Sequence, residues 1–224
     1  LWVVVPPALV AAGLTGGEHW KIYLPAVLLS FAVMIPAIIA AERKGKMRPI
    51  YAGAVALLVV VQAGLALFGG GIWMTGLWLL LFFVAFNILE ALQPSLISRI
   101  APPTSKGAAL GIYNTTQSLG LFLGGAVGGI LAQHYGASGV FGVGIVLALI
   151  WLLIAVTMQA PPVVALREFF IQPHVDIEHL REQLAGLPGV REAVVEPEKR
   201  IAYLKVNLER WDERRVRQLI GGGA

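Results

Sequence analysis

The sequence contains no cysteine and few charged residues. Asp, Glu, Lys and Arg make up 13% of its 224 residues, whereas about a quarter is usual for soluble domains. Without cysteine the sequence offers no disulfide, no thiolate metal ligand and no thiol nucleophile. Hydrophobic residues make up 57%, and this composition favours a protein that lies in a lipid bilayer.

Motifs for enzymatic chemistry are also missing from the sequence. It contains no Gly-rich phosphate-binding loop, no serine nucleophile elbow and no His-Glu-x-x-His zinc motif. Two of the four histidines, His174 and His179, lie near the C-terminus, but no cysteine or clustered carboxylate supplies further metal ligands. The sequence therefore predicts no enzyme, no metal site and no cofactor.

The charged residues divide the chain into two regions. Residues 1–159 contain seven basic and three acidic residues, while residues 160–224 contain ten of each. The net charge of +4 therefore belongs to the apolar region, and no basic surface for nucleic acid is expected. This distribution indicates a membrane domain followed by a small domain in water.

The apolar region contains five segments long enough to cross a bilayer, because a helix needs about 20 apolar residues to do so. They cover residues 21–40, 50–68, 72–98, 106–132 and 138–159. A shorter apolar segment, residues 1–14, is interrupted by Pro6 and Pro7, and we expect it to be the end of a longer span. The predicted fold class of residues 1–159 is an all-α polytopic membrane helix bundle.

The loops between the predicted spans alternate in charge. The loops at 42–48 and 99–106 are basic, whereas those at 69–71 and 133–138 contain no charged residue. By the positive-inside rule the basic loops face the cytoplasm. One further crossing predicts that the C-terminal domain lies in the cytoplasm as well.

Residues 163–224 have the pattern of a small α+β domain, joined to the membrane region by a linker at 160–162. Runs of β-branched and apolar residues and apolar residues at helical spacing predict its elements. Strands are expected at 163–171, 190–196 and 200–207, and helices at 176–185 and 211–220. Asp176 is the expected N-cap of the first helix. The order βαββα corresponds to part of a ferredoxin-like sandwich.

Glu90 is the only charged residue in the interior of a predicted span, and Asn87 and Gln93 flank it about one turn away. A carboxylate in hydrocarbon is costly unless it is protonated, paired or facing a water-filled cavity, and such residues usually line a substrate or proton pathway. The alternative is a protonated Glu90 that only forms hydrogen bonds between helices, or one that lies near enough to the cytoplasmic end to reach water.

The next span contains a polar stripe and a glycine repeat. Tyr113, Asn114, Gln117 and Ser118 are spaced so that they share one helix face. This stripe could line the same cavity as Glu90, or it could only hold two helices together. A small-xxx-small repeat follows and predicts close helix packing. It is formed by Gly120, Gly124 and Gly128.

Two motifs resemble the major facilitator superfamily of transporters. The first is the loop AERKGKMRP at 41–49, which is similar to the cytoplasmic loop that recurs in each half of those proteins. The second is FNILEALQPSLIS at 86–98, followed by KGA at 106–108 and the Gly-rich helix, which resembles the tenth and eleventh helices of YajR-type members. Those members also carry a cytoplasmic ferredoxin-like tail, so the match covers essentially the whole chain as a C-terminal half.

The resemblance implies a proton-driven exporter of small organic compounds or drugs in a bacterial inner membrane, working by alternating access between two bundles. This chain would supply one bundle, and the N-terminal bundle would be missing. No cofactor is implied, and the partners would be lipid, protons and a small-molecule substrate. The resemblance also implies that charged contacts of the first basic loop hold one conformation, although these residues could equally only set topology. The loop residues concerned are Glu42, Arg43, Lys44, Gly45, Lys46 and Arg48.

Two alternatives to export stay open from the sequence alone. In one, the helices are an anchor and dimer interface for a binding or sensory protein whose active part is the soluble tail. In the other, the protein is a solute importer, because direction depends on coupling and on affinities that a sequence does not reveal.

Overall fold

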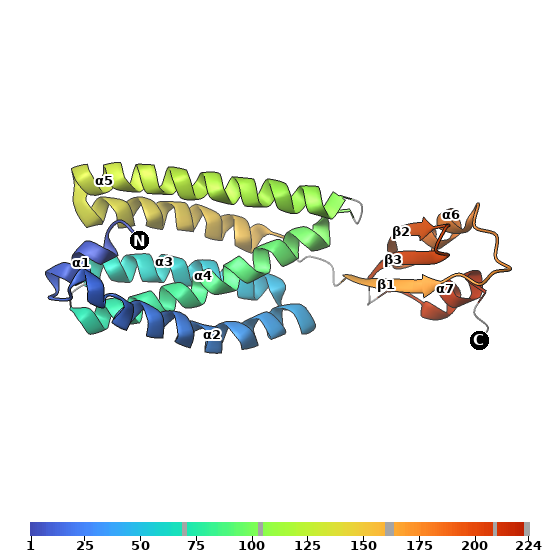
Figure 1. The fold of residues 1–224 in the computed structure, drawn as a ribbon, viewed down its shortest axis with the longest axis horizontal. Helices are drawn as coiled ribbons and strands as arrows, with labels where there is room; N and C mark the ends of the chain where they lie inside the picture. Colours follow the sequence, from blue (N-terminus) through green and yellow to red (C-terminus); the bar gives the residue numbers. More distant parts are fainter. Residues whose placement is uncertain (69–70, 103–104, 160–163, 208–209, 222–224) are drawn as a thin grey trace. The chain divides into compact units, whose positions relative to one another are not determined.

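The structure is a computed structural model that describes residues 1–68, 71–102, 105–159, 164–207 and 210–221. The chain divides into two compact units, Leu1–Pro161 and Pro162–Ala224. The first is helical and the second contains a small β-sheet (Figure 1). Four predicted features lie wholly or partly outside the described residues: the linker at 160–162, the glycines at 69–70, positions 103–104 of the second basic loop and Val163, the expected first residue of the first strand.

The apolar segments form the long helices of the first unit. A short helix, α1 (Val5–Ala11), and a 3-10 turn, Gly16–Glu18, precede them. The long helices are α2 (Trp20–Arg43), α3 (Met47–Phe68), α4 (Ile72–Ile100) and α5 (Lys106–Thr157). By length and composition, the described part of the chain contains four helices able to cross a membrane.

Helix α5 contains the last two predicted spans and reverses direction at Gly136. This residue has φ 64° and ψ −161°, outside the helical region. The two arms, 106–135 and 137–157, run side by side (Figure 1) and line a common cavity. The sequence predicted a break over 133–138, but helical geometry continues on both sides of Gly136. One residue is enough for the reversal because glycine lacks a Cβ and tolerates positive φ.

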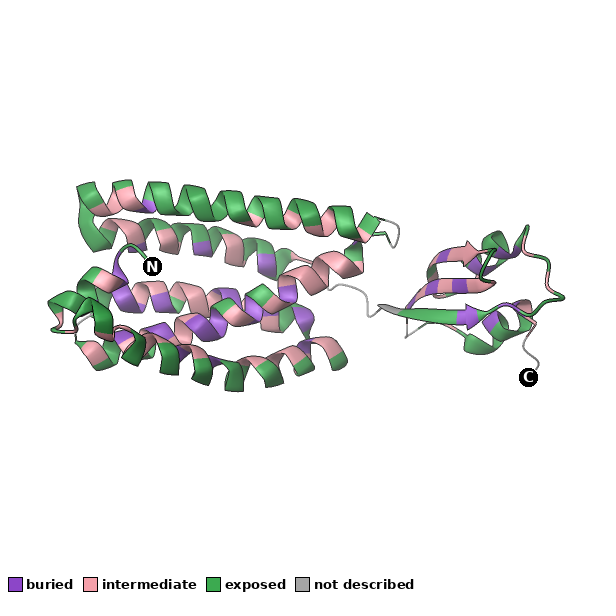
Figure 2. Ribbon diagram, viewed as in Figure 1, coloured by how far each residue is buried: buried purple, intermediate pink, exposed green. Residues whose placement is uncertain are grey.

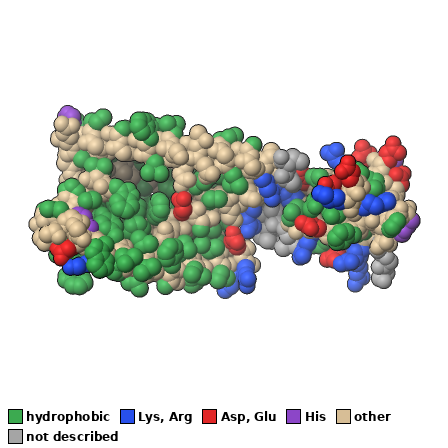
Figure 3. All heavy atoms as spheres, viewed as in Figure 1, with side chains coloured by type: hydrophobic (Ala, Val, Ile, Leu, Met, Phe, Trp, Pro, Cys, Tyr) green, Lys and Arg blue, Asp and Glu red, His purple; other side chains and the backbone are tan. Residues whose placement is uncertain are grey.

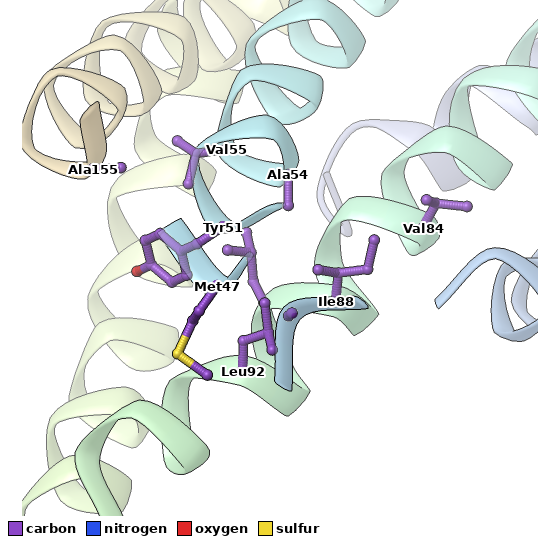
Figure 4. Packing of buried hydrophobic residues seen from close by; sticks show 10 residues of the cluster. Met47, Tyr51, Ala54, Val55, Val84, Ile88, Leu92 and Ala155 are labelled. Atoms are coloured by element: carbon purple, nitrogen blue, oxygen red, sulfur yellow. The ribbon is translucent and has the colours of Figure 1, made fainter. Parts of the chain in front are cut away.

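Helices α3 and α4 form the centre of the helical unit. Figure 2 shows buried residues concentrated on them, whereas much of α2 and α5 is exposed. Figure 4 shows the side chains that pack between the helices: Met47, Tyr51, Ala54, Val55, Val84, Ile88, Leu92 and Ala155. Lipid tails are as apolar as these side chains, so the exposed hydrophobic residues of α2 and α5 suit a bundle solvated by lipid.

The second unit is a three-stranded antiparallel sheet with two helices. Its strands are β1 (Val164–Phe170), β2 (Val190–Glu196) and β3 (Ile201–Asn207), in the order β1-β3-β2. Its helices are α6 (Leu180–Ala185) and α7 (Glu213–Leu219). Alternate residues of β3 are buried, and they join Leu180, Leu184 and Val216 of the helices in one hydrophobic core.

The first helix of this unit is shorter than the sequence predicted. It begins at Leu180 rather than near 176, and Asp176 does not cap it. Instead, Asp176 Oδ1 accepts a hydrogen bond from the Glu178 amide at 3.0 Å. The sequence prediction was wrong at this position because an Asp side chain stabilises a tight turn of its own backbone as readily as a helix start.

Candidate functional site

Glu90 of α4 is joined to α5 by a bifurcated amide contact. The Gln117 Nε2 atom donates to Glu90 Oε1 at 3.1 Å and to Oε2 at 2.9 Å. Glu90 is exposed and Gln117 is half-buried. Among the described residues, no Lys or Arg pairs with Glu90, because the ion pairs all involve other acidic groups. The carboxylate is therefore hydrogen-bonded but has no positive charge beside it.

A second polar bond joins the same two helices less than one turn further along α4. The Tyr113 hydroxyl of α5 donates to Gln93 Oε1 of α4 at 2.9 Å, and both residues are half-buried. Together with the Gln117–Glu90 contact, it places two bonded polar pairs on one seam. The seam between α4 and the first arm of α5 is thus polar, in contrast to the hydrophobic packing of α3 against α4.

Asn87 points to a different helix. Its Nδ2 atom donates to Ser30 Oγ of α2 at 2.7 Å, and Ser30 in turn donates to the Val27 carbonyl at 2.6 Å. Ser30 is fully buried at 0% exposure. Asn87 therefore holds α4 to α2, one turn from the carboxylate on the same helix.

The polar stripe of α5 divides into two pairs of residues. Tyr113 and Gln117 reach α4, as described above. Ser118 instead donates to the Asn114 carbonyl within α5 at 2.9 Å, and both Ser118 and Asn114 are exposed. The structure therefore brings Glu90, Gln93, Tyr113 and Gln117 together, and leaves Asn114 and Ser118 outside these contacts.

The two basic loops lie at the same end of the helical unit. Glu42, in the last turn of α2, accepts a hydrogen bond from Ser95 Oγ of α4 at 2.7 Å and lies 3.9 Å from Arg99 Nη2. Arg48, in the first turn of α3, donates to the Val156 carbonyl near the end of α5. These contacts connect the ends of four helices.

The first basic loop is shorter than predicted, since Glu42 and Arg43 belong to α2 and Arg48 belongs to α3. Its remaining residues include Gly45, which has φ 64° and so allows the tight reversal. Arg43, Lys44 and Lys46 are exposed. The candidate conformational contacts of this loop are therefore those of Glu42 and Arg48.

The glycine repeat lines a cavity. Gly120 and Gly124 have no heavy atom of the described residues within 4 Å of a Cβ built on them, while Gly128 has only Val3 Cγ2 at 3.9 Å. These glycines line an apolar cavity of about 400 Å³ between the two arms of α5 and α3. Close helix packing at the repeat stays a prediction.

Several polar contacts were not predicted from the sequence. Ser30, Ser95 and the Tyr51–Trp151 pair, in which the indole Nε1 donates to the hydroxyl at 3.1 Å, all connect helices. The sequence could have indicated the contact of Ser30, which is an isolated serine in the apolar run of α2. A lone polar residue in a span usually has a partner on another helix.

Aromatic rings form a second feature that the sequence analysis missed. The rings of Phe82 and Phe86 on α4 stack with centroids 5.6 Å apart and 18° between their planes. The spacing of 82, 86 and 90 by four residues could have indicated that both rings share a face with Glu90. No group of three or more His, Asp or Glu residues suited to a metal occurs in the part of the chain that the structure describes.

Comparison with known proteins gives consistent results. The family model described as Major Facilitator Superfamily matches residues 2–195. The Inner membrane transport protein YajR of Escherichia coli (strain K12) is 39% identical over 207 residues, which are 92% of this chain and 46% of that protein. An uncharacterized transporter of Buchnera aphidicola subsp. Baizongia pistaciae (strain Bp) is 30% identical over 136 residues, 60% of this chain and 34% of that protein. The chain spans about half the length, or less, of these curated relatives.

Proposed function

The chain belongs to the major facilitator superfamily, and on this premise we propose that it forms the C-terminal bundle of a proton-coupled secondary transporter. The transporter exports small organic compounds or drugs by alternating access between two bundles. Family membership and the similarity to YajR confirm the resemblance predicted from the sequence motifs. The observation that carries the proposal is the Glu90 carboxylate, which lies in an apolar helix without a positive partner among the described residues.

The environment of Glu90 suits reversible protonation. A carboxylate within a bilayer is tolerated when it faces a water-filled cavity or takes up a proton. The Gln117 amide donates to both oxygens of the carboxylate, and a proton taken up by Glu90 removes the charge when the surroundings become apolar. Glu90 thus has a stable form in each of the two environments that alternating access creates.

The other polar residues near Glu90 support this role. Gln93 and Tyr113 bond to each other and Asn87 bonds to Ser30, so these side chains fix the relative positions of α2, α4 and α5 around Glu90. Asn114 and Ser118 are exposed on α5 and supply polar groups for a substrate. We propose that this whole set lines the substrate and proton pathway.

The N-terminal bundle supplies the other wall of the cavity. The chain covers 46% of the length of the E. coli relative, which leaves room for a second set of spans. The residues of this set that are exposed in this chain, Glu90, Asn114 and Ser118, then face that bundle. Transport requires both bundles.

The charged end of the bundle sets the orientation of the protein in the membrane and the conformation of the helix ends. Both basic loops lie at this end, which by the positive-inside rule faces the cytoplasm of a bacterial inner membrane. Glu42, through Ser95 and Arg99, and Arg48, through Val156, hold the helix ends together in one conformation. The tail is a cytoplasmic ferredoxin-like domain: its β-α-β-β-α order and β1-β3-β2 sheet correspond to five of the six elements of that fold.

Proton binding at Glu90 is tested with dicyclohexylcarbodiimide, which reacts with protonated carboxyl groups in apolar surroundings. The full-length protein is labelled between pH 6 and pH 9, and adducts are located by mass spectrometry. We expect an adduct at Glu90 that decreases as the pH rises, and no corresponding adduct in Glu90→Gln. The matched control is Glu18→Gln, which removes a carboxylate paired with Lys21 and should leave labelling of Glu90 unchanged. Absence of an adduct at Glu90 over the whole pH range would contradict the proposal.

A further inference from the structure

Two buried polar atoms at the start of α2 have no partner in the part of the chain that the structure describes. They are Nε2 of His19 and the hydroxyl oxygen of Tyr23. His19 is the N-cap residue of α2, and Tyr23 follows four residues later, so both side chains lie on one face of the helix. Their ring centroids are 6.5 Å apart. Unpaired buried polar atoms are destabilising and uncommon in native proteins, so this pair points to a role other than packing.

Residues 1–14 pack against this face of α2. The Trp2 ring stacks on Tyr23 with centroids 5.4 Å apart and 13° between the planes. Phe83 of α4 lies edge-on to both rings, with centroids 6.4 Å away. Further along α2, Ala26 belongs to the same hydrophobic cluster as Leu9 of α1. Rings and apolar side chains therefore hold the segment 1–14 on α2 beside the two unpaired polar atoms.

The surroundings of His19 offer no free negative charge. Residues 1–14 contain no Asp, Glu, Lys, Arg or His, so the amino group of Leu1 is the only charged group there, and residues 72–83 of α4 contain none. The adjacent acid, Glu18, is bound by Lys21 Nζ at 2.6 Å and by Thr15 Oγ1 at 2.9 Å. A positive charge on the imidazole would therefore have no carboxylate of its own among the described residues.

The protonation state of His19 decides whether this site can stay closed. A neutral imidazole can accept a hydrogen bond at Nε2 from the Tyr23 hydroxyl, either directly or through a buried water. In the imidazolium both ring nitrogens are donors. A cation without an acceptor or a carboxylate beside it is costly in apolar surroundings, so the protonated ring requires the site to open to water.

We propose that His19 and Tyr23 form a pH-sensitive latch, which holds the segment 1–14 on α2 when His19 is neutral and releases it when His19 is protonated. Histidine is the side chain whose charge ordinarily changes between pH 5 and pH 8. The latch lies at the start of α2, and the first basic loop follows the end of this helix, 24 residues and about 36 Å away.

The position of the latch in the membrane rests on the proposed orientation of the protein. With the basic loops in the cytoplasm, the latch lies on the opposite side, which is the more acidic side under an inward proton gradient. Acidification of that side then releases the segment 1–14 from α2. This release does not require proton binding at Glu90.

The test measures the distance between α1 and α2 by double electron–electron resonance at pH 8 and pH 5. Spin labels are attached through Val10→Cys in α1 and Ile39→Cys in α2, which replace exposed side chains. The full-length protein, without other cysteines, is held in lipid nanodiscs. We expect one distance at pH 8 and, at pH 5, a second population displaced by about 5 Å or more, one helical turn. His19→Gln should lack this second population, because glutamine does not titrate.

Two control variants separate the latch from other pH effects. His134→Gln removes an exposed histidine of α5, whose Nδ1 lies 3.0 Å from the Ile130 carbonyl, and should respond to pH as the wild type does. Glu90→Gln should also keep the response. Equal distance distributions of the wild type at pH 8 and pH 5, or a pH response that persists in His19→Gln, would overturn the latch. Carbodiimide labelling of Glu90 on the same preparations tests the proposed function separately.

Discussion

The helical unit and the small α+β unit place hydrophobic and polar side chains in opposite positions. In the helical unit, large hydrophobic residues cover the outside and polar side chains are bonded between helices. In the tail, a hydrophobic core is enclosed and charged residues cover the outside, as the visible face in Figure 3 illustrates. The surrounding solvent, rather than the residue type, therefore decides which side chains stabilise each unit.

The comparison predicts that the same core truncation costs more in the tail than in the helical unit. Leu204 of β3 and Leu92 of α4 are both 0% exposed. Leu204→Ala should destabilise the tail by about 2–5 kcal/mol, because it loses both transfer from water and packing. Leu92→Ala should cost less, since lipid tails are as apolar as leucine and only packing is lost.

Hydrogen–deuterium exchange of the β3 amides in the full-length protein measures the first effect, and unfolding of the helical unit in mixed detergent micelles measures the second. An equal or larger loss for Leu92→Ala would show that the helical unit is not solvated by lipid.

A second pair of substitutions places a charge on each outer surface. Leu149 in the second arm of α5 is 48% exposed and Leu166 in β1 is 47% exposed. Leu149→Arg should impair membrane insertion by about 2.5–3.5 kcal/mol, whereas Leu166→Arg should be tolerated because its side chain extends into water. The yield of inserted full-length protein in isolated membranes distinguishes them, and normal insertion of Leu149→Arg would argue against this arm as a membrane span.

Hydrogen bonds between helices should contribute less to the free energy of unfolding than the hydrophobic contacts of the tail do. Ser30→Ala removes the acceptor of the 2.7 Å bond from Asn87 and should cost about 0.6–1.7 kcal/mol. Unfolding of the helical unit reports this loss. Asn87→Ala should cost a similar amount, and the double variant should cost no more than either single one if the two residues act only through each other.

The smallest effect is expected for surface charges of the tail. Arg217 and Glu213 form an exposed i,i+4 ion pair on α7 with its closest atoms 2.6 Å apart. Glu213→Gln should destabilise the tail by about 0.3–0.5 kcal/mol, and the difference should vanish at about 1 M salt, where the Debye length is about 3 Å. A loss above 1 kcal/mol that persists in high salt would mean that Glu213 has a further partner.

Hydrophobic length was sufficient to predict that the first unit is mostly helical, because lipid imposes a strong apolar pattern on the segments that cross it. The sequence preferences of turns and helix caps were less informative about single residues. The reversal at Gly136 was predicted as a loop of six residues, and Asp176 was assigned to a helix that begins at Leu180. In each case a short polar or glycine-containing segment has several stable backbone arrangements, and the fold selects one.

The sequence indicated which residues are candidates for the site, but not which of them contact one another. Glu90 stood out as an isolated charge, yet its contact with Gln117 depends on how α4 packs against α5. The bonds of Asn87 to Ser30 and of Glu42 to Ser95 likewise join positions more than 50 residues apart. Helical spacing identifies which residues share a face, but not which neighbouring helix they meet.

The most direct test of the account is flux driven by a proton gradient through the full-length protein in proteoliposomes. Uptake of ethidium, chloramphenicol and fluorescein, one cationic, one neutral and one anionic compound, is measured with an acidic interior. The account predicts that the wild type and Glu18→Gln accumulate at least one of them and that Glu90→Gln accumulates none. Accumulation by Glu90→Gln at the wild-type level, or none by the wild type, would contradict it.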